Sequence, residues 1–351
     1  MSVSKQGKPG QGEIQAQEQD ALVIGAGMAG LTAARALRRA GRRVTVLEAG
    51  AVPGGRMATE QLGPGLADVG AQYFVARTPS FQAQVTRWIQ SGLVYLWAMG
   101  FSTGSLKENV AQGQARYAVK GGMVALARHL ARGLDLHLGQ AAERVDLQEA
   151  GWEVLAGGQR FRGRSLLLAL PAPQALALLD RGEAALAQEE REILAAIRYE
   201  PSLTALFWVE GEVHIPSPGA VQRPIDAIPW IGDNQQKGIS PQARIITVQA
   251  SGEYSRRMWE APDMEILDSL AARLEPYLDP SAQIREARLK RWPLGTVSAR
   301  APVSQPFLMA ESLPGLFCAG DAFSIPRLEG AFLSGTRAGE ALAAWLAENR
   351  T

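Results

Sequence analysis

The most regular pattern of apolar positions lies near the start of the chain. Residues 21–24 form an uninterrupted apolar run that ends at a glycine, which predicts a short buried strand. Apolar residues then recur at helical spacing over residues 29–39, and a second apolar run at residues 44–47 predicts the next strand. This order of strand, helix and strand is typical of a parallel α/β sheet.

Further apolar patterns predict the other elements of the chain. Helical periodicity predicts helices over residues 79–91, 121–130, 173–198, 263–274 and 329–348. Apolar runs or alternation predict strands within residues 93–119 and at residues 134–138, 152–155, 166–170, 202–210, 223–231, 244–250, 283–292 and 316–319. The alternation in the middle of the chain is typical of antiparallel strands with one exposed face.

Three glycines, Gly25, Gly27 and Gly30, give the spacing G-x-G-x-x-G between the first strand and its helix. The first permits a tight turn, the second lets the backbone approach a pyrophosphate, and the third lets the helix pack on the strand. Glu48 ends the second strand, near the ~20-residue offset at which a carboxylate meets a ribose hydroxyl. An acid here favours an unphosphorylated ribose, as in NAD or FAD. The pattern predicts a dinucleotide site.

Composition and charge narrow the function classes. The chain has 351 residues, 46% of them hydrophobic, and a net charge of +1, so it is long enough for two domains and has no electrostatic footprint for nucleic acid. No apolar run approaches the ~18 residues of a membrane span, so no membrane partner is predicted. Residues 1–19 are polar and predict a disordered leader without a signal-peptide core, which favours a cytoplasmic protein.

Cysteine and histidine offer little chemistry. Cys318 is the single cysteine, which excludes an internal disulfide and a C-x-x-C redox pair, and its apolar surroundings predict a core residue. No metal site is predicted, because the histidines have no suggestive neighbours; they are His129, His137 and His214.

Two later segments favour a ligand site. Arg56 follows a glycine pair just after the acid-terminated strand, and its guanidinium offers a fixed-charge donor to a phosphate, although a solvated surface arginine would show the same pattern. Residues 68–74, DVGAQYF, place small residues before polar and aromatic ones. Such a segment suits a path beside a flat ring.

Together these motifs resemble the FAD-binding motifs of the flavin amine oxidoreductase superfamily, and within it the chain is most similar to the bacterial renalases. The resemblance rests on GGRM at residues 54–57, DVGAQYF, and GDAF…EGAFLSG at residues 320–335. It implies FAD as the cofactor, Asp321 as an acceptor for the ribityl chain, and a helix N terminus near Gly330 that stabilises charge on the reduced flavin. The predicted cofactor-binding residues are Gly25, Gly27, Ala29, Gly30, Glu48, Ala49, Gly55, Arg56, Met57, Gln72, Tyr73, Phe74, Val145, Gly320, Asp321, Glu329, Gly330, Ala331 and Ser334.

The resemblance also implies an architecture. We expect an α/β fold in which a Rossmann-type FAD-binding domain carries an inserted mixed, mainly antiparallel substrate domain, as in p-hydroxybenzoate hydroxylase-like proteins. The expected FAD-binding domain comprises residues 20–76, 121–175 and 295–351, and the expected substrate domain comprises residues 77–120 and 176–294.

The function that the resemblance implies is a renalase-type oxidase. Bacterial renalases oxidise misformed isomers of dihydronicotinamide dinucleotides by hydride transfer to flavin N5, and dioxygen then reoxidises the flavin to give hydrogen peroxide. The alternative is a flavin amine oxidase or related desaturase. A non-catalytic protein similar to the GDP-dissociation inhibitors is disfavoured, because Glu48, Arg56 and Asp321 are all present.

Four residues are candidates for the pocket that binds the expected small-molecule substrate. Each of them could equally well be an ordinary packing residue. Gln249 stands where the family has a histidine. The candidates are Tyr73, Asn234, Gln249 and Trp292. The sequence leaves the oligomeric state open.

Overall fold

The computed structural model describes residues 19–104, 113–182 and 184–349. The leader predicted over residues 1–19 lies outside the described residues, except for Gln19, which begins the first strand.

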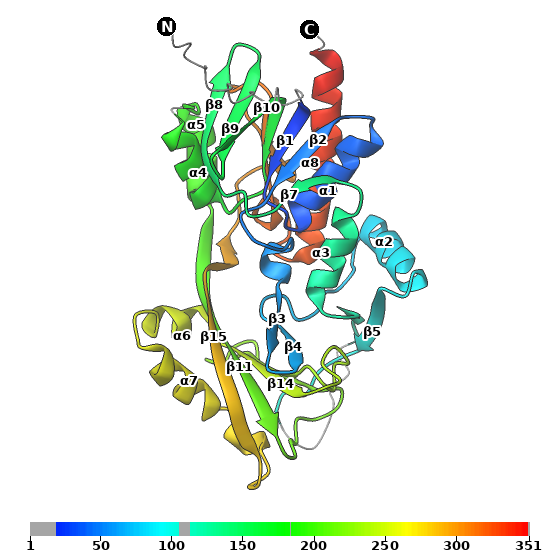
Figure 1. Cartoon of the computed structure of the whole chain (residues 1–351), viewed down its shortest axis with the longest axis vertical. Coiled ribbons are helices and arrows are strands. Elements are labelled where there is room, and N and C mark those ends of the chain that lie inside the picture. The colour runs from blue at the N-terminus through cyan, green and yellow to red at the C-terminus, as the bar shows by residue number, and fades with distance from the viewer. Residues whose placement is uncertain (1–18, 105–112, 183, 350–351) are drawn as a thin grey trace, which may run out of the picture.

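An eight-stranded sheet forms one half of the molecule, at the top of Figure 1. Its parallel strands, in spatial order, are β17 (Leu316–Ala319), β10 (Gln159–Leu168), β1 (Gln19–Ile24), β2 (Val44–Leu47) and β7 (Asp135–His137). The antiparallel strands β16 (Phe307–Met309), β9 (Gly151–Ala156) and β8 (Ala142–Gln148) extend it. Three segments far apart in the sequence therefore meet at the centre of this sheet.

Both faces of this sheet are covered, which explains the continuous apolar runs of β1 and β2. Ala21 and Val23 of β1 pack towards one face, and Leu22 and Ile24 pack towards the other. The first face carries α1 (Met28–Arg39), α2 (Pro79–Gln90), α3 (Met123–Ala131) and α8 (Leu328–Glu348). The second face carries α4 (Ala172–Arg181) and α5 (Gln188–Ala196). Residues of β8 and β9, which continue the sheet from the first part of β10, pack in the same apolar cluster.

Helices α1 and α8 approach each other closely enough for their backbones to touch. A Cβ atom at Gly335 would lie 2.0 Å from the carbonyl oxygen of Ala29. A Cβ atom at Gly339, one turn later, would lie 2.5 Å from the carbonyl oxygen of Ala33. Only glycine fits at these two positions of α8, so the first and last helices of the structure form one unit.

The other half contains a five-stranded antiparallel sheet. Its spatial order is β12 (Ala220–Gln222), β13 (Trp230–Asp233), β14 (Arg244–Gln249), β11 (Arg198–Glu210) and β15 (Gln283–Ala299). One face packs on α6 (Gly252–Arg257) and α7 (Asp263–Ala271), through residues such as Phe207 and Leu270. The opposite face packs on β3 (Thr59–Leu62) and β4 (Gly65–Asp68). The long strands β11 and β15 run between the two halves (Figure 1).

The predicted fold class is confirmed: the protein has an α/β fold with a Rossmann-like half and a mixed second half. The strand predicted over residues 223–231 is wrong for most of its length, because a loop separates β12 from β13 there. Pro224 and Pro229 lie in that loop, and proline lacks the N–H that a ladder needs. The helix predicted over residues 173–198 is divided into α4 and α5. The residue boundaries expected for the two domains stay a prediction.

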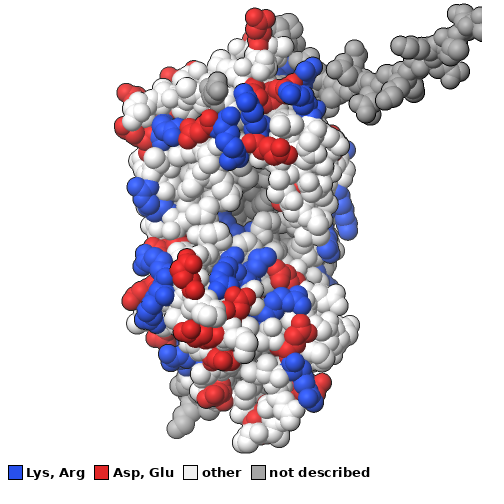
Figure 2. Space-filling model, turned by 60° about the vertical axis from the view of Figure 1, so that its left-hand side comes forward, with Lys and Arg blue, Asp and Glu red and all other residues white. Residues whose placement is uncertain are grey.

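The surface carries interspersed charges. Figure 2 shows Lys and Arg beside Asp and Glu over one face, which is hollowed between the two halves. None of the described helices is both long and apolar enough to cross a membrane. The small strands β5 (Val94–Ala98) and β6 (Arg116–Val119) pair with each other and complete the described strands.

Candidate functional site

The turn between β1 and α1 uses its three glycines differently. Gly25 has φ +101°, which favours glycine, and a Cβ atom at Gly30 would lie 1.9 Å from the carbonyl oxygen of Gly25. A Cβ atom at Gly27, by contrast, would meet no protein atom within 4 Å, and the same holds at Gly320 after β17. Both open positions follow the carboxyl ends of parallel strands, where ligands of α/β sheets bind. The turn therefore fits a dinucleotide.

Glu48 lies beside this turn at the end of β2. Its Oε2 accepts a hydrogen bond from the Ala26 amide at 2.7 Å, and its Oε1 accepts one from the Gly50 amide at 2.8 Å. Each carboxylate oxygen has two lone pairs, so the group can still accept from ribose hydroxyls. Glu48 thus ties β2 to the glycine turn and fits the ribose role predicted for it.

Replacing Glu48 tests that role. We expect Glu48→Ala to reduce FAD affinity by ~1.5–3 kcal/mol, because charge-assisted hydrogen bonds are lost. Titration of apoprotein with FAD, followed by quenching of flavin fluorescence, measures the change. Glu143→Ala is the matched control, since Glu143 is an acid on β8 that also accepts a backbone hydrogen bond, from Gly158. Equal affinity in the two variants would remove Glu48 from the cofactor site.

Arg56 and Asp321 are paired with each other. Arg56 lies in the short helix η1 (Gly55–Met57), and Asp321 begins η3 (Asp321–Phe323). The guanidinium donates to both carboxylate oxygens, at 2.7 Å and 3.2 Å. The sequence predicts that Arg56 contacts a phosphate and that Asp321 contacts the ribityl chain. The pair joins GGRM, which contains Arg56, to GDAF, which contains Asp321. The contacts of both residues with the cofactor stay a prediction.

Two other predicted cofactor residues hold the protein together. Ser334 of α8 accepts a hydrogen bond from the Gly320 amide at 2.8 Å, and so fixes the turn before Asp321. The carboxylate of Glu329 is 1% exposed and accepts from the Thr78 amide at 2.6 Å and the Thr78 hydroxyl at 2.7 Å. It also accepts from the Arg77 amide. Glu329 therefore caps α2, a role that its sequence neighbourhood does not indicate.

The remaining predicted cofactor residues differ in exposure. Val145 and Phe74 lie in apolar clusters, and Gln72 folds back to donate to the carbonyl oxygens of Asp68 and Gly70. The buried ones are Ala29, Met57, Gln72, Phe74, Val145 and Gly330, and the partly or fully exposed ones are Ala49, Gly55, Tyr73 and Ala331. Their contacts with FAD stay predictions.

One row of residues crosses the second sheet on the face towards β3 and β4. Cross-strand neighbours follow one another from β12 to β15 in the order Gln222, Trp230, Gln249, Thr204 and Lys290. Gln222 donates to the Tyr73 hydroxyl at 2.7 Å, and Lys290 donates to Glu60 of β3 at 2.9 Å. The row thus lies against the segment that contains DVGAQYF.

The four candidate pocket residues gather around that segment. Gln249 donates to the carbonyl oxygen of Gly70 at 2.8 Å, and the Trp292 indole donates to that of Val69 at 2.9 Å. Asn234 is 1% exposed, and its Nδ2 donates to the Ile245 carbonyl and the Thr247 hydroxyl, both at 2.9 Å. Asn234 therefore has its N–H groups engaged within the protein. Substrate contact by the four stays a prediction.

An aromatic cluster adjoins Tyr73, and sequence reasoning missed most of it. The cluster consists of Tyr73, Trp97, Phe101 and Trp230, with ring centroids 4.8 to 5.9 Å apart. The Arg116 guanidinium lies 5.1 Å from the Phe101 ring and 5.7 Å from the Tyr73 ring, and Lys237 Nζ lies 5.1 Å from the Trp97 ring. Only the aromatic spacing around Trp97 offered a signal in the sequence.

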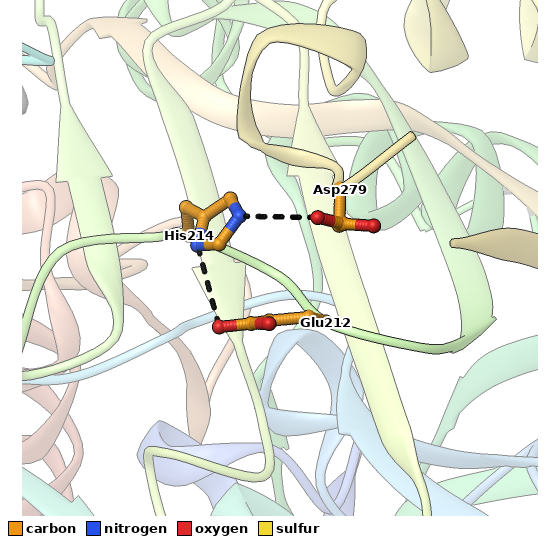
Figure 3. Close-up of side chains that lie close together, drawn as sticks. All are labelled: Glu212, His214 and Asp279. Atoms are coloured by element: carbon orange, nitrogen blue, oxygen red, sulfur yellow. Dashed lines mark ion pairs between the residues drawn. The ribbon is translucent and has the colours of Figure 1, made fainter. Parts of the chain in front are cut away.

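Two chemistry-bearing groups lie elsewhere. Cys318 is buried in β17, where burial raises the pKa of its thiol to about 12, so it is protonated at neutral pH. Figure 3 shows His214 between Glu212 and Asp279, with nitrogen–oxygen distances of 3.8 and 3.9 Å. These three side chains have potential metal-ligand atoms within 4.8 Å of one another, yet exposed acidic groups commonly lie so close without an ion. The predicted lack of a metal site stays a prediction.

Comparisons with known proteins agree with this geometry. A family profile described as NAD(P)-binding Rossmann-like domain matches residues 23–90, and one described as flavin containing amine oxidoreductase matches residues 89–343. A lysine-specific histone demethylase 1 homolog 2 from Oryza sativa subsp. japonica is 64% identical over 42 residues, which are 12% of this chain and only 6% of the demethylase.

Solved structures share the fold over nearly the whole chain. Cyclohexylamine oxidase from Brevibacterium oxydans IH-35A has a TM-score of 0.72 and 16% identity, covering 94% of this chain and 100% of that one. Wild-type putrescine oxidase bound to putrescine has a TM-score of 0.68 and 16% identity, covering 95% and 99%. At such identities the likeness shows the fold alone. The second profile, however, matches more than half of the chain: the chain belongs to the flavin containing amine oxidoreductase family, and it is an FAD-dependent oxidoreductase.

Proposed function

We propose that the protein is a renalase-type oxidase, which oxidises an aberrant isomer of a dihydronicotinamide dinucleotide. When bound, FAD would supply the redox chemistry, as the acceptor of the hydride and the carrier of its two electrons to dioxygen, which takes up two protons to give hydrogen peroxide. The glycine turn, Glu48 and the segments after β4 and β17 would hold it. The protein's own task is to place the donor carbon and exclude water.

The observation that carries this proposal is the occupation of the aromatic cluster by protein cations. Arg116 lies over Phe101 and Tyr73, and Lys237 lies over Trp97, at distances typical of cation–π contacts. A protonated amine would compete with these cations for the same rings. A reduced nicotinamide ring is neutral, so it would not compete with these cations for the rings.

The engagement of the nearby carboxylates supports the same substrate class. Asp321 is paired with Arg56, and Asp68 is buried against Lys237. Glu329 accepts from the two backbone amides that precede α2. None of these three is poised as a general base. A misformed dihydronicotinamide needs none, because loss of hydride gives an aromatic pyridinium directly.

Anaerobic stopped-flow measurement of flavin reduction tests the proposal. The 2- or 6-dihydro isomer of NAD should bleach the flavin in one fast turnover, whereas ordinary NADH, reduced at the 4-position, should be ~100-fold slower because the wrong carbon is presented. Putrescine and cyclohexylamine serve as the amine comparison. If no dihydronicotinamide isomer reduces the flavin while an amine does, the alternative amine oxidase function takes its place.

A further inference from the structure

Five side chains from the antiparallel sheet and from the loop after β13 hold the backbone or carboxylate of one short segment that begins at the end of β4. Residues 68–70 lie at the start of DVGAQYF, and we call the five side chains that bond to them the clasp. They are Asn234, Lys237, Thr247, Gln249 and Trp292. Asn234 accepts from the Asp68 amide at 3.4 Å, and Thr247 donates to the Asp68 carbonyl at 3.1 Å.

The centre of the clasp is a buried ion pair. Lys237 Nζ lies 2.5 Å from Asp68 Oδ2, and the two side chains are 1% and 0% exposed. Asp68 Oδ1 in turn accepts from the Thr59 hydroxyl at 2.5 Å and from the amide of Met123, the first residue of α3, at 2.7 Å. One carboxylate therefore joins β3, α3 and the second half.

The other side of the segment lies against the Arg56 motif. The Ala71 amide donates to the Arg56 carbonyl at 2.9 Å, and a Cβ atom at Gly70 would lie 2.0 Å from that oxygen. Arg56 is paired with Asp321. A shift of residues 68–71 would therefore displace the Arg56–Asp321 pair.

Stability alone does not account for the buried Asp68–Lys237 ion pair. Burial opposes the charged form of lysine and lowers the pKa of Lys237, and buried ion pairs are often no better for stability than apolar residues of similar volume. Such a pair does select one geometry, because either charge left alone in the interior is strongly unfavourable.

We propose that Lys237 is a positioning residue for the cofactor: through Asp68 it fixes residues 68–71 against Arg56, and thereby sets the affinity of the first half for FAD. The inference concerns the cofactor, so it does not depend on which substrate the protein oxidises.

Three variants separate positioning from stability. Lys237→Met leaves Asp68 as an unpaired buried charge, so it should lower both the melting temperature and FAD affinity. Asp68→Asn/Lys237→Met removes both charges and should recover most of the melting temperature, while the dissociation constant for FAD stays about tenfold above that of the unaltered protein. Leu270→Ala, in α7 on the opposite face of the sheet, should lower the melting temperature through a core cavity and leave the FAD dissociation constant unchanged.

Amide hydrogen exchange of the apoprotein provides a readout that does not depend on flavin. The peptide covering residues 69–74 should exchange faster in the double variant than in Leu270→Ala, because local protection reports local contacts. If the double variant recovers both FAD affinity and protection, the pair is only structural and the proposal fails. If the double variant does not fold, Thr247→Val removes the bond to the Asp68 carbonyl and the acceptor of one Asn234 N–H. The proposal then requires faster exchange and weaker FAD binding in that variant.

Discussion

Gly27→Ala should leave the protein folded and weaken FAD binding by about 10- to 100-fold, whereas Gly30→Ala should destabilise the fold by about 3 kcal/mol or more. A methyl group at Gly27 meets no protein atom within 4 Å, so only a ligand that approaches the backbone can clash with it. A methyl group at Gly30 would lie 1.9 Å from the Gly25 carbonyl oxygen, and a backbone atom cannot move aside cheaply.

Thermal unfolding and FAD titration of the two variants check this contrast. Gly41→Ala is a control for the general effect of glycine replacement. A Cβ atom at Gly41 would meet no protein atom within 4 Å, and the φ of +75° adds backbone strain far from the predicted pyrophosphate. Full FAD affinity in Gly27→Ala would show that the cofactor does not approach this turn.

Glu329→Ala should lower the free energy of unfolding by about 3 kcal/mol and leave the affinity for FAD nearly unchanged. The substitution removes the acceptor of the Thr78 amide and hydroxyl and of the Arg77 amide at the start of α2. Buried donors without acceptors are costly, which explains the size of the effect.

Chemical denaturation with parallel FAD titration measures both quantities for Glu329→Ala. Glu340→Ala, on the exposed side of α8 and paired only with Arg337, should change stability by about 0.5 kcal/mol or less. A large loss of FAD affinity with little loss of stability would instead support the cofactor role that the sequence predicts for Glu329.

The sequence correctly predicted the elements whose pattern lies within a few neighbouring residues. The strand, glycine turn, helix and second strand around Gly25 were found within two residues of their observed ends, because their signal is a short-range alternation of apolar, small and charged residues. The resemblance of GGRM, DVGAQYF and the residues at 320–335 predicted the flavin amine oxidoreductase superfamily, and with it the fold class.

The partners of buried polar groups were not predictable in this way. Asn234 is predicted to line the substrate pocket; in the structure it is buried and bonded to the Asp68 amide, 166 residues away. Nothing in the sequence around Lys237 indicates its burial, although it is the most deeply buried lysine of the described residues. Whether a polar side chain faces water or a partner depends on segments that meet only after folding.

The packing of α8 against α1 determines when the protein can mature during its synthesis. Strand β1 and helix α1 are synthesised before β10, which must arrive before β1 has both neighbours, and β17 and α8 are synthesised after β10. Until then the inner face of α1 has no glycine-bearing helix to cover it. Contacts between such distant segments close slowly. A nascent chain that is released before α8 is synthesised would therefore expose the apolar face of α1. Chaperones and proteases would act on such a chain before it could bind FAD.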